Sequence, residues 1–228
     1  MKKYEIFLFD ADGTLYDFGK DEESALRRMF EQCGFEYSEN VLKRYRALSA
    51  ELWDAYEKGK MKKRDLQKLR FERLFDEFEI RYDALEFNDN YIEKLGEGRF
   101  LIDGAIEICE TIASAGKPIF IVTNGFKRVQ EPRLKNSPIY KYISDVFISE
   151  VVGYPKPEER YFDHVFSNIP QVSKDKILII GDSLAADIAG GNKAGVDSCW
   201  FNEHGVENKT SALPTYEISD LSELRKFV

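Results

Sequence analysis

Cysteine and histidine are scarce in this 228-residue sequence, and the few that occur stand far apart. The three cysteines, Cys33, Cys109 and Cys199, form no CxxC pair and sit among apolar neighbours. This pattern predicts small buried side chains rather than disulfides or a thiolate metal site. The two histidines, His164 and His204, are not accompanied by a nucleophile motif such as G-x-S-x-G, so a hydrolase built on a catalytic triad is unsupported.

Long apolar runs and an excess of positive charge are also missing. No run approaches the roughly 18 apolar residues that span a membrane. Glu5 and Asp10 interrupt the apolar start of the chain before it reaches the length of a secretory signal. The net charge of -8 argues against nonspecific binding to nucleic acid or to an anionic membrane. We therefore expect a protein of the reducing cytoplasm with no nucleic-acid partner and no membrane partner.

The sequence does contain short apolar runs that alternate with helical patterns. Four runs are apolar on both faces, which is typical of parallel strands covered by helices on both sides of a sheet. They are Tyr4–Phe9, Pro118–Val122, Val146–Ile148 and Lys176–Ile180. A fifth run, Ser198–Phe201, predicts an edge strand, and the tail ISDLSELRKFV predicts a helix with Ser219 as its N-cap. This alternation predicts a doubly wound parallel α/β sheet.

One long segment breaks the alternation. From about residue 17 to residue 94 the chain shows only charged, amphipathic helical patterns. Three apolar stripes recur there: Ala25, Met29, Phe30 and Cys33; Leu42, Tyr45, Leu48, Leu52 and Tyr56; and Leu66, Leu69, Phe75 and Phe78. We expect a helical unit over residues 17–94, inserted into a core formed by residues 1–16 and 95–228. The basic run Lys58–Asp65 indicates an exposed junction between two of its helices.

Polar residues follow several of the predicted strands. Asp10 and Asp12 come after the first, Thr123 and Asn124 after the second, and Asp182 after the fourth. Because open α/β sheets bind ligands at the carboxyl ends of their strands, we expect these side chains to lie along one rim. Each motif alone is a common turn, but their joint appearance in this order favours a shared site.

The residue types suit phosphoryl transfer. The Asp10 carboxylate can attack phosphorus and form an acyl phosphate. Asp12, which the chain can turn away at Gly13, can protonate the leaving oxygen and later deprotonate water. The hydroxyl and amide donors of Thr123 and Asn124 suit phosphoryl oxygens.

Several carboxylates in one place also need compensating positive charge. Asp182 has Ser183 beside it and Asp187 about one helical turn further on. Such oxygen ligands near a phosphate favour Mg²⁺. Lys156, held between two prolines in GYPKPEE, can supply the other positive charge.

Four of these motifs, taken together, resemble those of a known family. FDADGT, TNG, the lysine of YPKP and GDSLAAD resemble, in order, the four motifs of the haloacid dehalogenase-like (HAD) hydrolase superfamily. The resemblance covers nearly the whole chain and implies a Rossmann-like core with an inserted α-helical (type 1) cap. By position it implies the following roles: nucleophile and Mg²⁺ ligand Asp10; general acid/base Asp12, whose backbone carbonyl also binds Mg²⁺; phosphoryl-binding Thr123, Asn124 and Lys156; Mg²⁺ ligand Asp182; and Asp187 and Ser183 as outer partners of the metal site, Asp187 through water.

A finer resemblance concerns the substrate. TNGF, ISEVVGYPKPEERYF and GDSLAADIAGGNKAGVDSCWFN are similar to the bacterial pyrimidine 5'-nucleotidase branch, which implies a nucleoside monophosphate substrate. Gly13 stands where that branch often has another aspartate, and Pro132 and Pro138 should disturb the helix expected after TNGF. Cap side chains would set specificity. Trp53, Tyr56 and the basic run are candidates, although packing within the cap also explains the two aromatic residues.

Other functions stay open from the sequence. A phosphatase of small sugar or organic phosphates, a phosphonate hydrolase and a phosphomutase fit the same motifs, whereas a dehalogenase is disfavoured by Asp12. From a different class, a non-catalytic phosphorylatable aspartate switch would also use aspartates and a lysine. The expected partner is a small phosphorylated metabolite, and the expected state is a monomer or a dimer.

Overall fold

The structure is a computed structural model and describes residues 2–228. The chain divides into two compact units. One consists of the N-terminal residues up to Phe18 together with Arg99–Val228, and the other consists of Gly19–Gly98.

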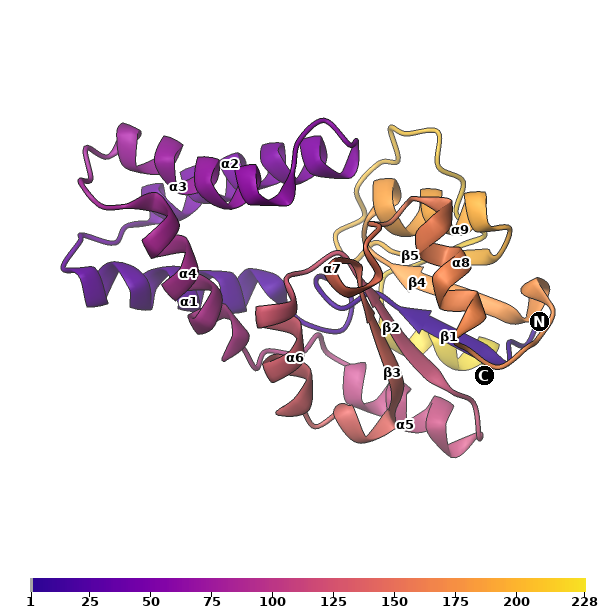
Figure 1. The fold of residues 1–228 in the computed structure, drawn as a ribbon. Helices are drawn as coiled ribbons and strands as arrows, with labels where there is room; N and C mark the ends of the chain where they lie inside the picture. Colours follow the sequence, from indigo (N-terminus) through magenta and orange to yellow (C-terminus); the bar gives the residue numbers. More distant parts are fainter. Residues whose placement is uncertain (1) are drawn as a thin grey trace. The chain divides into compact units, whose positions relative to one another are not determined.

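The first unit is built on a parallel six-stranded sheet (Figure 1). Its strands are β1 (Ile6–Phe9), β2 (Ile119–Thr123), β3 (Ile143–Ile148), β4 (Ile177–Gly181), β5 (Asp197–Phe201) and β6 (Tyr216–Ile218). Their order in the sheet is β3-β2-β1-β4-β5-β6, so β1 and β4 are neighbours from which the chain winds outward in opposite directions. The predicted doubly wound, Rossmann-like fold is confirmed.

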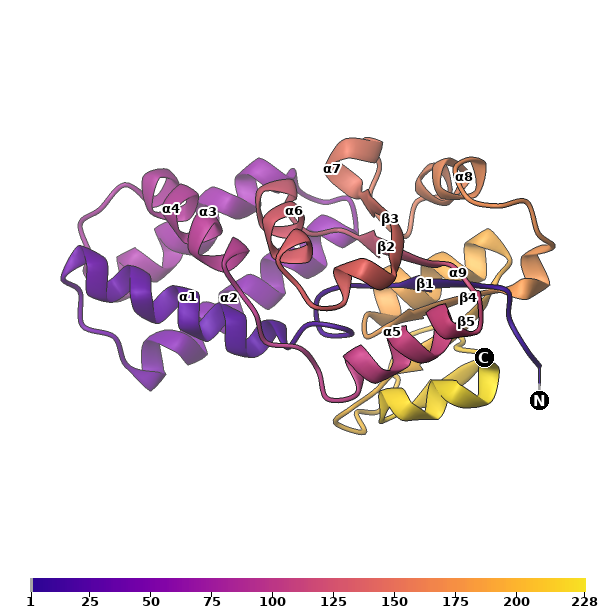
Figure 2. The same cartoon turned by 90° about the horizontal axis from the view of Figure 1, so that it is seen from below.

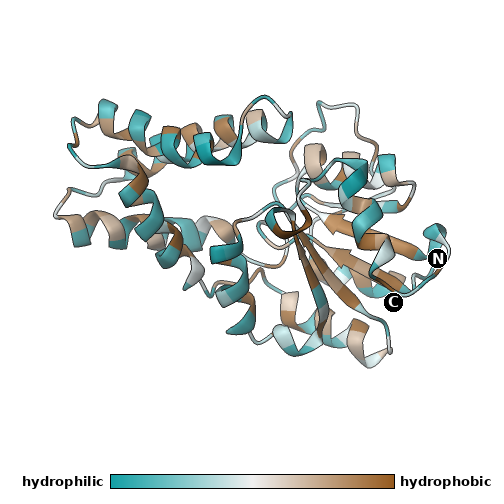
Figure 3. Cartoon of the chain, in the orientation of Figure 1, coloured by the Kyte–Doolittle hydropathy of each residue, from teal (hydrophilic) through white to brown (hydrophobic). Residues whose placement is uncertain are grey.

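The strands are apolar on both faces because both faces are covered. Phe7 and Phe9 of β1 belong to a core cluster that also holds residues of α5 (Ala105–Ser114) and η4 (Leu221–Phe227). Ile6 and Leu8 point to the opposite cluster, which includes residues of α8 (Glu159–Ser167). Figure 2 shows α5 and the C-terminal helix on one side of the sheet and α8 on the other, and the strands are the most hydrophobic elements in Figure 3.

The C-terminal end of the chain differs from the prediction. β5 is not an edge strand, because β6 pairs outside it, with Phe201 beside Ile218. The tail is therefore divided between a strand and a helix. The N-cap is Asp220 rather than Ser219: its side chain accepts a hydrogen bond from the Ser222 backbone at 2.7 Å and starts the 3₁₀-helix η4.

The edges of the sheet differ from its centre. β3, the outermost strand, begins at Ile143, three residues before the predicted start; Ser144 and Asp145 are exposed, whereas Phe147 and Ile148 at its end are buried.

Of the cysteines, Cys109 and Cys199 are buried free thiols, whereas Cys33 is only half-buried. Among residues 2–228, no helix combines the length and the hydrophobicity needed to cross a membrane.

The second unit is helical. Its helices are α1 (Phe18–Cys33), α2 (Glu39–Glu57), α3 (Lys63–Glu77) and α4 (Ala84–Gly96). Ser38 caps α2 by accepting from the Val41 backbone at 3.3 Å, and Asp83 caps α4 by accepting from the Glu86 backbone at 2.8 Å. The basic run connects α2 to α3, beginning at the C-cap residue Lys58 and ending in the first turn of α3, and it is largely exposed, as predicted.

Aromatic packing decides which residues of this unit are buried. Phe71 stacks on Tyr45 with ring centroids 5.4 Å apart and lies 4.8 Å from the ring of Phe87. The third predicted stripe is therefore wrong in part: Leu69 and Phe78 are only half-buried, whereas Phe71 and Leu74 are fully buried. The half-buried Trp53 and Tyr56 have rings 5.6 Å apart at 82°, with the Lys63 ammonium within 5.9 Å of both.

Candidate active site

The candidate active site lies at the carboxyl ends of β1, β2 and β4. Asp10 directly follows β1, and its backbone N–H donates to the Ile180 carbonyl of β4 at 2.8 Å. Asp182 directly follows β4. Because the winding of the sheet reverses between these two strands, their carboxyl ends open a crevice in which α/β proteins bind ligands.

The Lys156 ammonium connects three of the groups in this crevice. Its ammonium donates to Asp10 Oδ1 at 2.6 Å, to Asp187 Oδ1 at 2.6 Å and to the Val122 carbonyl at 2.7 Å. An ammonium has three N–H donors, so all three are used. The side chain is only 2% exposed, and two of its three acceptors are carboxylates.

The turn after β2 holds the main chain of this lysine. The Asn124 side chain donates to the Lys156 carbonyl at 2.9 Å and accepts from the Lys156 N–H at 2.8 Å. Thr123 Oγ1 accepts from the Gly125 N–H at 2.9 Å, which tightens the same turn. The structure thus brings Thr123, Asn124 and Lys156 together and shows the Asn124 side chain fixing the lysine.

The segment after β4 positions two further carboxylates. Ser183 Oγ accepts from the Ala186 backbone at 3.1 Å and starts η3 (Leu184–Ile188), a single π-helical turn. This wider turn brings Asp187 back toward the strand end, where its carboxylate accepts from the Ser183 N–H at 3.2 Å. Trp200 Nε1 donates to the Asp182 carbonyl at 2.9 Å. Trp200 was not predicted as a site residue.

Two glycines permit the close approach of these groups. A Cβ on Gly13 would lie 2.5 Å from Asp182 Oδ2, and the backbone of Gly13 has a φ of +80°. A Cβ on Gly181 would lie 2.2 Å from the Asp187 carboxyl. Any other residue would push the carboxylates apart, so both positions require glycine.

The resulting cluster can hold a cation. One carboxylate oxygen each from Asp10, Asp182 and Asp187 lies within 4.8 Å of the other two. Hard oxygen ligands at this spacing suit Mg²⁺. The single ammonium of Lys156 cannot neutralise three carboxylates, so the residues present fit a divalent ion.

The pKa values express the same surplus of negative charge. Burial raises the pKa of Asp10 well above its usual range, and the carboxylates of Asp187, Asp182 and Asp12 add to this against the opposing charge of Lys156. Burial alone would lower the pKa of Lys156, but Asp10 and Asp187 outweigh it and raise that pKa. Both pKa values are raised because one ammonium faces several carboxylates: the ammonium holds its proton tightly, and the surplus carboxylates disfavour a further negative charge.

Asp182 shows the same effect at the edge of the cluster. Lost hydration and the charge of Asp187 raise its pKa to about 7. Asp182 is nevertheless an exposed residue, so the neighbouring carboxylates account for more of this shift than lost hydration does. A bound cation would relieve the repulsion.

The side chain of Asp12 points to different partners. Gln130 Nε2 donates to Asp12 Oδ2 at 2.6 Å, and the Arg133 guanidinium forms an ion pair with Asp12 Oδ1. Both partners come from α6 (Lys127–Lys135), and neither was predicted as a site residue. The available signal was the buried face of this helix, on which Gln130 and Arg133 lie three residues apart.

The two prolines disturb this helix less than predicted. Pro132 lies inside α6 at an exposed position, and the helix continues to Lys135. A proline inside a helix removes its own N–H bond and crowds the carbonyl four residues earlier. The buried side chains of this helix, Val129, Gln130, Arg133 and Leu134, hold the rest of it in place. Pro138 follows the end of the helix.

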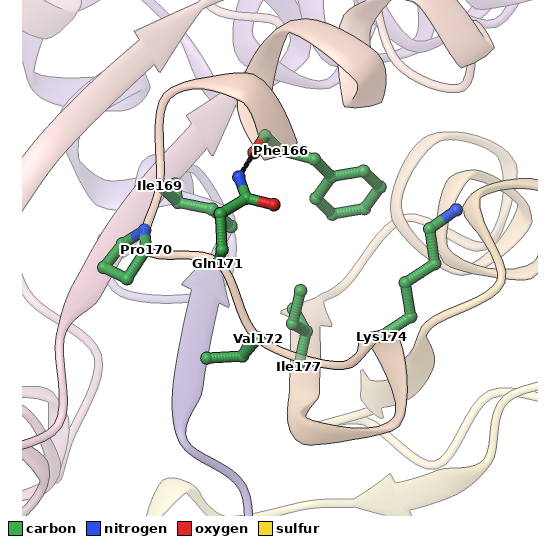
Figure 4. A pocket seen from close by; sticks show the side chains of 7 residues that line it. All are labelled: Phe166, Ile169, Pro170, Gln171, Val172, Lys174 and Ile177. Atoms are coloured by element: carbon green, nitrogen blue, oxygen red, sulfur yellow. Dashed lines mark hydrogen bonds between the residues drawn. The ribbon is translucent and has the colours of Figure 1, made fainter.

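A separate small cavity lies at the opposite end of β4 (Figure 4). It has a volume of about 110 Å³. Its lining residues are Phe166, Ile169, Pro170, Gln171, Val172, Lys174 and Ile177. Gln171 donates to the Phe166 carbonyl at 3.2 Å. Ile177 begins β4, whereas Asp182 follows its end, so this cavity is not part of the carboxylate site.

Comparison with known proteins decides the family. The profile of the haloacid dehalogenase-like hydrolases matches residues 4–195. The chain belongs to this family. The predicted family is therefore confirmed, and the protein is a hydrolase.

Two relatives with assigned activities match over almost the whole chain. The pyrimidine 5'-nucleotidase PynA of Streptococcus pneumoniae is 35% identical over 97% of this chain and 93% of its own. The pyrimidine 5'-nucleotidase YjjG of Escherichia coli is 31% identical over 99% of this chain and 98% of its own. This sequence similarity supports the predicted class of enzyme, a phosphoric monoester hydrolase.

A solved structure also matches over almost the whole chain. The HAD-hydrolase YfnB of Bacillus subtilis, crystallised with magnesium, superposes with a TM-score of 0.93 at 39% identity. The match covers 99% of this chain and 98% of that one, and the YfnB crystals reveal interdomain movement.

Proposed function

We propose that this protein is a Mg²⁺-dependent 5'-nucleotidase that hydrolyses nucleoside 5'-monophosphates, preferably of pyrimidines, to nucleoside and phosphate. The chemistry is supported above all by one observation: the buried Lys156 ammonium bridges Asp10 and Asp187 beside Asp182 at the switch point of the sheet. The substrate class is supported by the near-full-length similarity to PynA and YjjG.

In this proposal the cation is held by Asp10, Asp182 and the backbone carbonyl of Asp12. Mg²⁺ would supply positive charge that neutralises the carboxylates and the incoming phosphoryl group. Asp187 would help by fixing Lys156, to which it is bonded at 2.6 Å. The magnesium-bound crystals of YfnB support the choice of ion.

The reaction would proceed in two displacements on phosphorus. Asp12 would have to carry a proton on its solvent-facing side when substrate binds. A carboxylate oxygen of Asp10 attacks, the bond from phosphorus to the 5' oxygen breaks, and Asp12 gives that proton to the leaving oxygen. Water then attacks the aspartyl phosphate, the bond between phosphorus and Asp10 breaks, and the proton of the water passes to Asp12. Phosphate leaves, and both carboxyl groups return to their starting states.

The other predicted residues would bind the phosphoryl group or shape its site. Thr123 is buried at the end of β2, where its hydroxyl can meet a phosphoryl oxygen. Asn124 would act mainly by holding the main chain of Lys156. Ser183 would act by starting the turn that carries Asp187.

The direct test is a phosphate-release screen over nucleoside monophosphates, sugar phosphates and small organic phosphates. We expect Mg²⁺-dependent release that is fastest with pyrimidine monophosphates, falls to background in EDTA and returns with excess Mg²⁺. Faster turnover of sugar phosphates would replace the proposed substrate class. Absence of turnover on every substrate, with a phosphorylated Asp10 that persists, would instead favour an aspartate switch.

Asp182→Asn tests the proposed cation site. We expect the Mg²⁺ concentration for half-maximal activity to rise about 100-fold. Loss of a residue that only orients a metal ligand already weakens metal binding by about 10- to 100-fold, and Asp182 is proposed as a direct ligand. Without added cation, the same substitution should raise the melting temperature, because it removes one charge from a crowded cluster. A Mg²⁺ titration and a thermal melt measure the two effects. An unchanged Mg²⁺ requirement would assign the ion to other ligands.

A further inference from the structure

The Asp12 side chain is bonded to two residues of α6, which lie outside the four motifs. Each carboxylate oxygen has its own donor: Gln130 Nε2 on Oδ2 at 2.6 Å and the Arg133 guanidinium on Oδ1. The Arg133 side chain is 0% exposed, whereas the Asp12 side chain is 25% exposed. One side of the carboxylate is therefore held from inside the protein while another side faces solvent.

The two donors are themselves held in place. Arg133 Nη2 donates to Gln130 Oε1 at 3.0 Å, so the pair acts as one unit across three residues of a helix. The guanidinium also lies over the ring of Tyr16, 4.3 Å from its centroid. Gly125 leaves room for the Gln130 amide, since a Cβ there would lie 2.2 Å from Gln130 Nε2. The donors of this pair are thus preorganised.

We propose that Gln130 and Arg133 are positioning residues that aim the Asp12 carboxyl group at the oxygen leaving from phosphorus. This inference rests on the proposed phosphatase function. Two donors on two oxygens fix both the place and the plane of a carboxyl group, which a single hydrogen bond cannot do. Each oxygen has a second lone-pair direction, so the solvent-facing side stays available to a substrate oxygen or to water.

Positioning of this kind has a kinetic signature. Proton donation needs the donor and acceptor atoms within hydrogen-bond reach, about 2.6 to 3.2 Å. A nucleoside 5' oxygen leaves poorly unless it is protonated, whereas p-nitrophenolate is stable as an anion and needs little help. A displaced Asp12 should therefore slow the nucleotide much more than p-nitrophenyl phosphate. A general loss of folded protein would slow both substrates equally.

The test compares kcat/KM for uridine 5'-monophosphate and p-nitrophenyl phosphate in Gln130→Met and Arg133→Lys. The ratio kcat/KM reports the first displacement, in which the leaving oxygen departs. We expect a loss of about 30-fold on the nucleotide, part of the about 10²–10⁴ that general acid–base catalysis contributes, and a loss within about 3-fold on p-nitrophenyl phosphate. Lys135→Gln, on the exposed side of the same helix, should leave both unchanged. Equal losses on the two substrates would overturn the proposal.

Crystal structures of the two variants give a second readout that needs no activity. The Asp12 carboxyl group should turn or shift in both. If it keeps its position in both variants, Gln130 and Arg133 do not position it, whatever the kinetics. Because Arg133 is fully buried and its variant can lose the fold, Gln130→Met alone also decides the question. If the wild-type protein has no phosphatase activity, the proposed function is wrong. The crystal structures of the variants would still show whether Gln130 and Arg133 position the Asp12 carboxyl group.

Discussion

Asp10→Asn should reduce phosphate release at least about 10⁴-fold, the largest loss expected from any single substitution here. An amide oxygen is too weak a nucleophile to form the acyl phosphate, although it keeps the shape of the carboxylate. Lys156 retains its bonds to Asp187 and to the Val122 carbonyl, so the fold should survive. Initial rates with Mg²⁺ give the loss, and a thermal melt gives the stability.

The matched control is Asp163→Asn, which makes the same chemical change at an exposed position on α8. It should keep full activity. Radiolabelled substrate should leave acid-stable label on the wild-type protein and none on Asp10→Asn. Near-normal turnover by Asp10→Asn would show that another group attacks phosphorus, and the proposed mechanism would have to be abandoned.

Lys156→Met should affect both activity and stability, because the ammonium is the buried partner of two carboxylates. Removing one member of a buried ion pair leaves uncompensated charge and typically destabilises a protein by about 3 to 5 kcal/mol. The lost positive charge near the transferring group should lower kcat/KM by about 10³-fold, similar to the loss of one oxyanion-hole donor. Chemical denaturation and steady-state kinetics measure the two losses.

The stability loss should depend on pH in a defined direction. Burial and the neighbouring carboxylates already raise the pKa of Asp10, and Lys156 opposes that rise, so its removal raises this pKa further. A folded-state pKa above the unfolded value destabilises when the group is forced to ionise. The deficit should therefore be largest at neutral pH and shrink as the pH falls through the raised pKa.

Lys193→Met, an exposed lysine on α9 (Ala189–Ala194), is the control for this substitution and should change neither property. A Lys156→Met protein as stable as the wild type at neutral pH would mean that water or a cation already compensates the carboxylates. In that case the ammonium would not be the structural centre of the site.

Much of the site could be predicted from local sequence. Strand positions follow from runs such as those around Phe9, Val122 and Ile180, and parallel strands end at one edge of the sheet. The residues that come next, Asp10 and Asp182, must therefore converge. The family motifs and the helical patterns between residues 17 and 94 were also visible, because residue type and helical periodicity are carried by short stretches of chain.

Other features depended on contacts that no short stretch encodes. Gln130 and Arg133 meet Asp12 across separations of 118 and 121 residues, and polar residues on a helix carry no local mark of their partner. Likewise, no local pattern marked the stretch that ends at Ile218 as β6, the strand that pairs outside β5 just before the predicted helix. The order of residues along the chain was enough to place the polar groups of the site at the strand ends. The distant side chains that hold them could be found only in the folded protein, because hydrogen-bond partners are chosen by distance in space.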